Sequence, residues 1–475
     1  MKKLQNIIFN ESFIILFLLF VLSSVMFSRL GDATLSGDDC YYSELAKEMV
    51  VFNDYASPRF DGKVDFHTSK PPILFWMCAA SGKMFGFTSW SMRLPIAITG
   101  FLGVVFLFLF VKRFWGIYQG FIASIVLTFT QQYMFHARSP VTDCPFAVFF
   151  AASLIFFWFG KQISQKYYYA MGIFLGLAIM TRQIPGFFIC AVIIGYILLA
   201  HDNKPIKSIH FWLSLLVSSI IVAPWHILMY QYYGVGFIKQ YFGVTLMSGF
   251  SGYSNSVNPS INPWYAYFQI LANNYWPWLP FMIFGIYKYF KKVFDVGVEE
   301  KQKILFIFCW VFIPFVIFQI AKVKQHHYIM PLYFPFAIVV AGVFDEFRFN
   351  VKYRVTLSLI ILTFFLSVAY IFSPMLPNTL DSRYYADTIK LIPSVVNITK
   401  DIKTLPNDQY HYGNCFKFYA NKIVSAETEN EIINSILTQK KQCYILKKGD
   451  FDNIKRRVNN KIKIIKETSE SVLFE

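Results

Sequence analysis

Two adjacent carboxylates, Asp38 and Asp39, open the first long polar segment of the chain, directly after an apolar run. Leu45 and Met49 follow at helical spacing, which predicts an amphipathic helix that lies on a membrane surface. A helix start can also hold a metal ion or a phosphate. Aspartate is a common helix cap as well, so a structural role for the pair is compatible with a chemical one.

Two cationic residues of the same loop could bind a phosphate group. Lys70 precedes Pro71-Pro72, and this double proline fixes the chain direction where it returns to the membrane interface. Arg93 stands at the start of the next apolar run. Either side chain could instead extend its charged end to the lipid headgroups, so both interpretations stay open.

Further charged residues stand at the edges of later apolar runs. Asp143 is about to enter such a run, where a carboxylate is costly unless it is paired, and Arg138 is its nearest partner in sequence. The other members of this group are Arg182, Lys324, His326 and His327. In a chain with so few charges, the group predicts a polar cavity for an anionic, lipid-linked ligand. Its Asp and His residues could equally hold a divalent metal ion, although their spacing matches no metal-binding signature.

The elements that position these residues must be largely apolar. Of 475 residues, 56% are hydrophobic, 20% are aromatic and only 15% are charged. Soluble domains carry roughly 25% charged residues, so this composition excludes a soluble enzyme, and the aromatic content excludes disorder. The net charge of +16 fits basic cytoplasmic loops of a membrane protein better than contact with nucleic acid.

Apolar runs long enough to cross a bilayer recur through residues 1–373. The first run, 13–30, follows Met1-Lys2-Lys3 and is interpreted as an uncleaved signal anchor. Further spans are expected near 95–111, 117–134, 144–160, 166–181, 183–200, 208–230, 267–290, 303–320, 328–344 and 354–373. The total is about 11, and up to about 13. The stretch 71–87 is short and opens on two prolines, which favours an interfacial or re-entrant helix within the first outer loop, 31–94.

The distribution of basic residues predicts that the N-terminus lies in the cytoplasm. With alternating spans, the cytoplasmic loops then carry Lys112, Arg113, Lys161, Lys166, Lys204, Lys207, Lys288, Lys291, Lys292, Lys301, Lys303, Arg348, Lys352 and Arg354. The opposite loops carry few basic residues. An odd number of spans places the C-terminal tail on the outer side, and an error of one span would reverse that placement.

The polar tail, residues 374–475, is expected to form a small α/β domain. Strand-like runs at 442–446 and 461–465 accompany a helical stretch near 427–439. The seven cysteines of the chain include no CxxC pair, so a structural zinc site is not expected. Cys415 and Cys443 could pair if the tail faces an oxidising compartment, but sequence alone does not fix a pairing.

Several phrases of the sequence, taken together, match a known pattern. They are Asp38-Asp39-Cys40-Tyr41-Tyr42, Lys70-Pro71-Pro72-Ile73-Leu74-Phe75-Trp76, Arg93-Leu94-Pro95, Thr142-Asp143-Cys144-Pro145, Ala223-Pro224-Trp225-His226, Tyr328-Ile329-Met330-Pro331-Leu332 and Phe418-Tyr419-Ala420. The pattern resembles the GT-C superfamily of membrane glycosyltransferases. Within it, the chain is most similar to the protein-mannosyltransferase-like branch that includes the lipid A aminoarabinose transferases. That branch usually has an acidic residue where Ser69 stands here, which leaves the sugar and any metal undefined.

The resemblance implies a helical GT-C transmembrane domain that transfers a sugar, expected to be a hexosyl or pentosyl amino sugar, with inversion. The donor would be a polyprenyl-phosphate sugar such as one on undecaprenyl phosphate, and the first candidate acceptor is a lipid A phosphate on the periplasmic face. Asp38 becomes the key acidic residue, beside Asp39, and Asp143 the second. The expected phosphate-binding residues are Lys70, Arg93, Arg138, Arg182 and Lys324, and the expected substrate or metal contacts are Tyr41, His226, His326 and His327. The protein is expected to act as a monomer in a bacterial inner membrane, among membrane lipids. No cofactor is certain, and a divalent metal is a candidate.

Other functions are compatible with parts of this pattern. The acceptor could be a protein or another glycan. A transporter or flippase for a lipid-linked sugar predicts charges near mid-membrane and paired broken helices in two halves, and neither is evident in the sequence. An O-antigen-ligase-like or polymerase-type protein would place its large loop later in the chain. A membrane scaffold would not need the acidic pair and Lys70.

Overall fold

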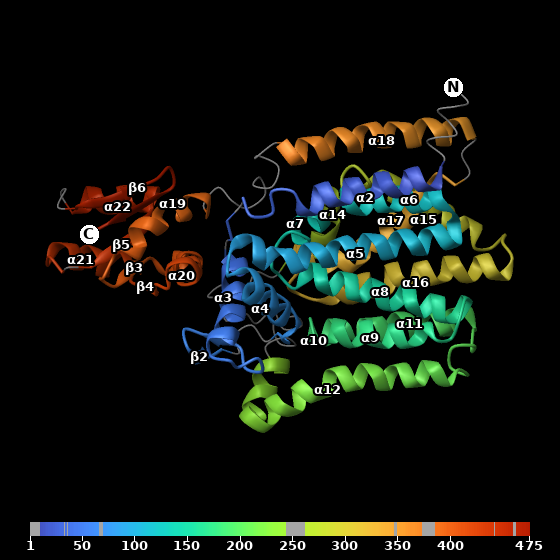
Figure 1. The fold of residues 1–475 in the computed structure, drawn as a ribbon, viewed down its shortest axis with the longest axis horizontal. Coiled ribbons are helices and arrows are strands. Elements are labelled where there is room, and N and C mark those ends of the chain that lie inside the picture. The colour runs from blue at the N-terminus through green and yellow to red at the C-terminus, as the bar shows by residue number, and fades with distance from the viewer. Residues whose placement is uncertain are drawn as a thin grey trace.

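The computed structural model describes residues 10–32, 34–35, 37–65, 70–243, 262–345, 349–372, 385–440, 442–458 and 462–475. Ser69 and the expected domain boundary between residues 373 and 374 lie outside the described residues. The described chain forms a long bundle of helices, a pair of helices at one end of the bundle, and a small domain with a β-sheet beyond that end (Figure 1).

The bundle contains the apolar helices, which run roughly along its long axis (Figure 1). They are α2 (Glu11–Phe27), α5 (Ser89–Trp115), α6 (Ile117–Thr128), α8 (Asp143–Gln162), α9 (Tyr167–Ile179), α11 (Phe188–Ala200), α12 (Ile209–Ile238), α14 (Ala266–Asn274), α15 (Leu279–Lys292), α16 (Val298–Ile320), α17 (Tyr333–Val343) and α18 (Phe349–Phe372). Among the described residues, 6 helical segments are long and apolar enough to cross a membrane, and shorter apolar helices accompany them. The total number of spans stays a prediction.

Several expected spans are interrupted near one end of the bundle. The run 117–134 becomes α6, which ends at Thr128, followed by the short helix α7 (Gln131–His136). The run 183–200 is divided into α10 (Gln183–Gly186) and α11. The run 267–290 is divided into α14 and α15, with Pro277 between them, because proline has no N–H to continue a helix. A 3-10 helix, η3 (His326–Leu332), leads into α17, and a π-helical turn, η1 (Lys239–Gly243), follows α12. These irregular connections carry polar residues that regular spans would not present.

The first outer loop forms α3 (Gly37–Val51), a two-residue hairpin of β1 (Arg59–Phe60) and β2 (Lys63–Val64), and α4 (Ile73–Phe85). The expected amphipathic character of α3 is wrong, because the helix is buried along most of its length, Glu44 and Glu48 included. It packs against α4 on one side and against α20 of the C-terminal domain on the other. Periodicity within α3 could not reveal this, because the covering helix comes from the other end of the chain.

The C-terminal domain agrees with the expected α/β character. Its elements are α19 (Tyr385–Val396), β3 (Ile402–Thr404), α20 (Pro406–Ala420), β4 (Val424–Ala426), α21 (Glu429–Leu437), β5 (Cys443–Lys447), α22 (Lys448–Arg457), β6 (Ile464–Glu467) and β7 (Ser471–Phe474). The sheet order is β4-β3-β5-β7-β6; β3 is parallel to β4 and β5, whereas β7 is antiparallel to β5 and β6. Along β5, Cys443 and Ile445 join one apolar cluster and Tyr444 and Leu446 join the other, as the alternation of a strand requires.

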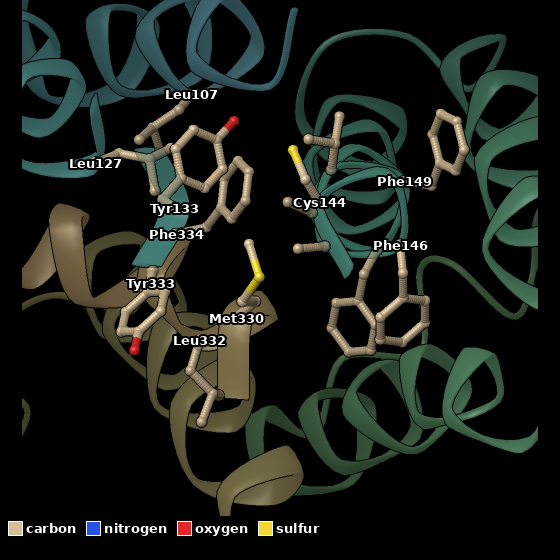
Figure 2. Close-up of a cluster of buried hydrophobic side chains, with 14 of the residues drawn as sticks. Leu107, Leu127, Tyr133, Cys144, Phe146, Phe149, Met330, Leu332, Tyr333 and Phe334 are labelled. Carbon is tan, nitrogen blue, oxygen red and sulfur yellow. The ribbon is translucent and has the colours of Figure 1, made fainter. Parts of the chain in front are cut away.

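An apolar core joins the irregular connections at the end of the bundle that faces α3. Figure 2 shows side chains of this core, among them Tyr133, Cys144, Met330 and Phe334, which come from α7, α8, η3 and α17. The ring of Tyr133 packs edge-on against Phe334 with 5.7 Å between centroids, and its hydroxyl donates to the Gly100 carbonyl oxygen at 2.7 Å. These contacts hold α7 against α5 and α17.

Candidate active site

A buried ion pair lies where α8 begins. Arg182, in the turn between α9 and α10, donates from its terminal guanidinium nitrogen to a carboxylate oxygen of Asp143, and both residues are buried. Arg182 also donates through Nε to Thr142 Oγ1 at 3.2 Å. A carboxylate in the first helical turn is favoured by the helix dipole, and its burial requires a close cation. The expected partner of Asp143 was Arg138, and the structure corrects this expectation to Arg182.

Lys70 approaches the same pair from the loop before α4. Its Nζ donates to Thr142 Oγ1 at 3.3 Å and lies 5.6 Å from the centroid of the Tyr42 ring. Burial, and to a smaller extent the charge of Arg182, lowers the pKa of Lys70 to about 8, although Asp143 and Asp38 favour its cationic form. Two cations therefore converge on Thr142, with one buried carboxylate between them.

The two carboxylates of the acidic pair face different surroundings, although both lie in the first turn of α3. Asp38 is exposed and lies close enough to Lys70 to interact with its charge. Asp39 is buried and interacts instead with the guanidinium of Arg93. Successive residues of a helix project about 100° apart, which separates the two neighbours. Asp38 alone of the two therefore borders the group around Asp143 and is open to a ligand.

Three histidines complete this end of the bundle. His136 of α7 and His326 and His327 of η3 have ring nitrogens that all lie within 4.8 Å of one another. His136 Nδ1 lies 3.9 Å and His327 Nε2 3.8 Å from carboxylate oxygens of Asp143. Burial lowers the pKa of His136 to about 4, so its ring is neutral at neutral pH. Imidazole nitrogens suit Zn²⁺ and related metals, so these histidines, with Asp143, are the residues that could hold a metal ion.

Two of the expected phosphate-binding arginines bind main-chain oxygens near the end of α2. Arg93 donates to the carbonyl oxygens of Leu30 at 3.1 Å and Thr34 at 2.7 Å. Arg138 donates to three carbonyl oxygens, those of Val25 at 2.7 Å, Met26 at 3.1 Å and Ser28 at 2.8 Å. The last carbonyls of a helix lack partners within the helix, and Arg138 satisfies those of Val25 and Met26 at the end of α2. Both arginines thereby hold the connection between α2 and α3.

Arg93 reaches that connection because the start of α5 is well defined. Thr88 Oγ1 accepts from the backbone N–H of Ser91 at 3.2 Å, and Ser91 Oγ accepts from the backbone N–H of Thr88 at 3.0 Å. This reciprocal capping box fixes the first turn of α5, and Arg93 lies just after that turn.

Three other expected contact residues have local partners. Lys324 is buried, and its Nζ donates to the Ala321 carbonyl oxygen at 2.7 Å. His226 lies in α12, where Nδ1 is 2.8 Å from the Val222 carbonyl oxygen and Nε2 is 2.8 Å from the Tyr241 hydroxyl. Tyr41 donates its hydroxyl hydrogen to Asp65. Their partners lie in other segments than the residues around Asp143; they are Ala321, Val222, Tyr241 and Asp65.

Sequence reasoning gave no role in the site to Tyr42, Thr142, Tyr328 or His136. The Tyr328 ring lies 5.4 Å from the Arg182 guanidinium carbon, and Thr142 joins Lys70 to Arg182. Tyr42, Thr142 and Tyr328 each stand inside a phrase that carried the family resemblance. Adjacency to Tyr41, Asp143 and His327 was the available signal for them.

Several known proteins have sequences that are similar to this chain. The sequence model of the family described as "Dolichyl-phosphate-mannose-protein mannosyltransferase" matches residues 69–228. A protein of Aquifex aeolicus named only as uncharacterized is 21% identical over 90% of this chain and 89% of its own length. The undecaprenyl phosphate-alpha-4-amino-4-deoxy-L-arabinose arabinosyl transferase 2 of Proteus mirabilis is 25% identical over 71% of this chain. The chain covers 61% of that transferase's length.

Comparison of structures points to the same fold. ArnT from Cupriavidus metallidurans, solved with undecaprenyl phosphate, superposes with a TM-score of 0.77 over 98% of each chain, at 16% sequence identity. The oligosaccharyltransferase AglB from Archaeoglobus fulgidus superposes with a TM-score of 0.59 over 91% of this chain and 69% of its own, at 12% identity. With the apolar helices, these matches indicate a multi-pass protein of the inner membrane. In sequence and in fold, the chain is therefore similar to the dolichyl-phosphate-mannose-protein mannosyltransferase family and to the undecaprenyl phosphate aminoarabinose transferases.

Proposed function

We propose that this chain transfers a sugar from a polyprenyl-phosphate donor to an acceptor at the outer face of the inner membrane. The single observation that carries the proposal is the group around Thr142, where Lys70 and Arg182 converge beside the exposed carboxylate of Asp38. The related Proteus mirabilis transferase is named for an undecaprenyl-phosphate sugar, and the similarly folded ArnT was solved with undecaprenyl phosphate. A lipid phosphate headgroup is the ligand that this group of charges suits best.

The chemistry needs cations where the donor phosphate departs. An acceptor oxygen attacks the anomeric carbon, the bond from that carbon to the phosphate oxygen breaks, and the phosphate leaves with the electron pair. Lys70 and Arg182 would take up the charge that grows on the leaving phosphate. Asp143 holds the Arg182 guanidinium in place, and Thr142 accepts hydrogen bonds from both cations. Attack from the face opposite the phosphate inverts the anomeric configuration.

The role of Asp38 depends on the acceptor. A hydroxyl acceptor must lose a proton, and Asp38 is the exposed carboxylate beside the cations that could take it. A phosphate acceptor, such as that of lipid A, is already an anion, and Asp38 would then orient the sugar or the acceptor. We propose a lipid A phosphate and an amino sugar first, because the named relatives act on an aminoarabinose donor. Asp39, Arg93 and Arg138 would position the loop that carries Asp38, rather than contact the donor.

The proposed orientation follows from the two ends of the bundle. Basic residues occupy the last turns of α5, α8 and α15, as Lys112, Lys161 and Lys291 exemplify. Asp143 begins α8, so the candidate site lies at the opposite end of that helix from Lys161. Basic ends face the cytoplasm, which supports an outer, periplasmic site with the C-terminal domain beside it. Residues 1–373 and 374–475 would then form the membrane and the periplasmic parts.

A transporter of lipid-linked sugars is the competing function. It predicts functional charges near the middle of the spans, between two related halves. In the described residues the group of Lys70, Asp143 and Arg182 instead occupies helix ends, which favours transfer at a surface.

Mass spectrometry of lipid A tests the proposal directly. We would compare cells that carry the intact gene, a deletion, and the Asp38→Asn variant at matched membrane levels. We expect a hexosamine- or pentosamine-sized mass on lipid A only with the intact gene. An unchanged lipid A profile after deletion would refute the acceptor. Full activity of Asp38→Asn would refute the site.

A further inference from the structure

A cysteine pair joins the candidate site's helix to the C-terminal domain. Cys40 lies in α3 directly after Asp39, and Cys415 lies in α20. Their sulfur atoms are 2.8 Å apart, and the two residues are 0% and 1% exposed. Non-bonded heavy atoms pack at roughly 3.5–4.0 Å, so these sulfurs lie closer than ordinary packing requires. Cys443, which the sequence allowed as a partner of Cys415, packs instead in the core of the C-terminal domain, whereas Cys40 and Cys415 share the core of the bundle.

Contacts on both sides of the cysteine pair fix the approach of α3 and α20. Lys417 Nζ lies 2.8 Å from Asp61 Oδ1 and 3.9 Å from Glu48 Oε1. The Tyr419 hydroxyl accepts from the backbone N–H of Leu35 at 2.9 Å. Lys47 Nζ donates to the Phe418 carbonyl oxygen at 3.2 Å. The cysteines therefore face each other within a packed interface whose register other contacts already define.

We propose that Cys40 and Cys415 form a disulfide that fastens the C-terminal domain to the helix that carries Asp38 and Asp39. The two thiols would give two electrons and two protons to the disulfide of a thiol–disulfide oxidoreductase. That disulfide is thereby reduced to two thiols. One thiolate attacks the oxidant, and the second displaces it from the mixed disulfide. The location of this oxidation rests on the proposed function, which places both segments in an oxidising outer compartment.

The bond forms as the domain docks, before the interface closes. Both sulfurs are inaccessible once α20 covers α3, and burial raises the pKa of the Cys40 thiol, so little thiolate exists in the folded state. The same burial protects the finished bond from reductants. The bond closes a loop across 375 residues, so it removes much freedom from the unfolded chain.

Differential alkylation of the protein in isolated membranes tests this proposal. Membranes are denatured in the presence of iodoacetamide without reductant, and the digest is analysed by mass spectrometry. We expect one cross-linked peptide pair that contains Cys40 and Cys415, while Cys443 and the remaining cysteines are alkylated. We also expect dithiothreitol to break the cross-link only after denaturation. Alkylation of Cys40 and Cys415 without prior reduction would overturn the proposal, as would a cross-link between Cys415 and Cys443.

Matched variants separate the stability that the disulfide provides from the stability that comes from packing of the cysteine side chains. Cys40→Ala, Cys415→Ala and the double variant should each lower the melting temperature by the same amount, roughly 5 °C or more. Cys443→Ala is the control: it removes a buried thiol of the same size but should leave the cross-link intact. A double variant whose loss equals the sum of the two single losses would contradict a shared bond. Absence of sugar transfer in a protein that carries the cross-link would refute the proposed function and leave the disulfide standing.

Discussion

The two ends of α8 each bury an ion pair, but the surroundings of the two pairs differ. At the end away from the candidate site, Lys161 Nζ lies 2.9 Å from Asp202 Oδ2, and the side chains are 3% and 4% exposed. Lys161 also donates to Gln302 at 2.8 Å and lies over the Trp158 ring, while the Tyr196 hydroxyl donates to Asp202 at 3.2 Å. Each charge there has its opposite charge and neutral partners.

The pair at the site end has different neighbours. Arg182 and Asp143 compensate each other there, Lys70 adds a second cation at Thr142 whose charge interacts with Asp38, and neutral histidines stand beside the Asp143 carboxylate. A buried charge persists only when something compensates it. At the end near Lys161, protein groups therefore surround both charges, whereas at the site end the exposed carboxylate of Asp38 lies beside two cations and marks where a ligand could approach.

Removing the cation of each pair gives the largest expected difference. Arg182→Met and Lys161→Met both leave a buried carboxylate without its cation, so both should destabilise the protein by about 3–5 kcal/mol. Per folded molecule, Arg182→Met should also lower sugar transfer by roughly 10²–10³-fold, because stabilisation of the leaving phosphate is lost. Lys161→Met should keep normal transfer. Thermal unfolding and a transfer assay on the purified proteins measure both effects.

The same two variants can contradict the proposed difference between the two ends of α8. Equal losses of transfer in Arg182→Met and Lys161→Met, after correction for folded protein, would mean that both pairs are only structural. Lys161→Arg serves as a further control, because it keeps the charge and should restore stability.

The pH dependence of transfer should report Lys70. Its lowered pKa of about 8 means that the side chain is a cation below that pH and becomes neutral as the pH rises through it. Because kcat/KM reports the free enzyme, it should fall about tenfold for each pH unit above this pKa. Lys70→Arg keeps its charge at all these pH values and should lose this decline. A decline that persists unchanged in Lys70→Arg would assign it to another group.

Chelation should have a smaller effect than either cation variant. Lys70 and Arg182 already supply positive charge, and they repel a divalent ion beside them. We therefore expect transfer to persist in EDTA, while His136→Ala lowers it by roughly tenfold through the loss of a neutral hydrogen-bonding ring near the phosphate. Loss of transfer in EDTA with recovery on addition of Zn²⁺ would show instead that the three histidines and Asp143 hold a metal.

The sequence predicted which residues belong to the candidate site better than it predicted which residues they contact. Lys70, Asp143 and Arg182 were expected on one face of the membrane, and they meet at Thr142. Their charge distinguished them in an otherwise apolar chain, because a charge at a membrane span is costly and is usually paired or functional. The strands near 443–447 and the helix near 429–437 were visible for a similar reason, since apolar alternation and helical spacing are local signals.

The partners were not visible, because they depend on contacts between distant segments. Arg138 is close to Asp143 in sequence but reaches back to carbonyl oxygens of α2, more than 100 residues earlier in the chain. Cys415 meets Cys40 rather than Cys443, because α20 lies on α3. Hydrophobic periodicity reports which face of an element is buried, not which element covers it.

The smallest expected effects come from one hydroxyl at each end of α8. Thr142→Val removes the oxygen that accepts from both Lys70 and Arg182, whereas Tyr196→Phe removes one donor to Asp202. Each change should cost about 1 kcal/mol of stability, the typical net value of a hydrogen bond. Thr142→Val should also raise the KM for the donor several-fold, because the two cations lose their common anchor, and Tyr196→Phe should leave KM unchanged. An equal KM for both variants in the transfer assay would show that Thr142 does not organise the cations, and the difference between the two ends would then rest on Lys70 alone.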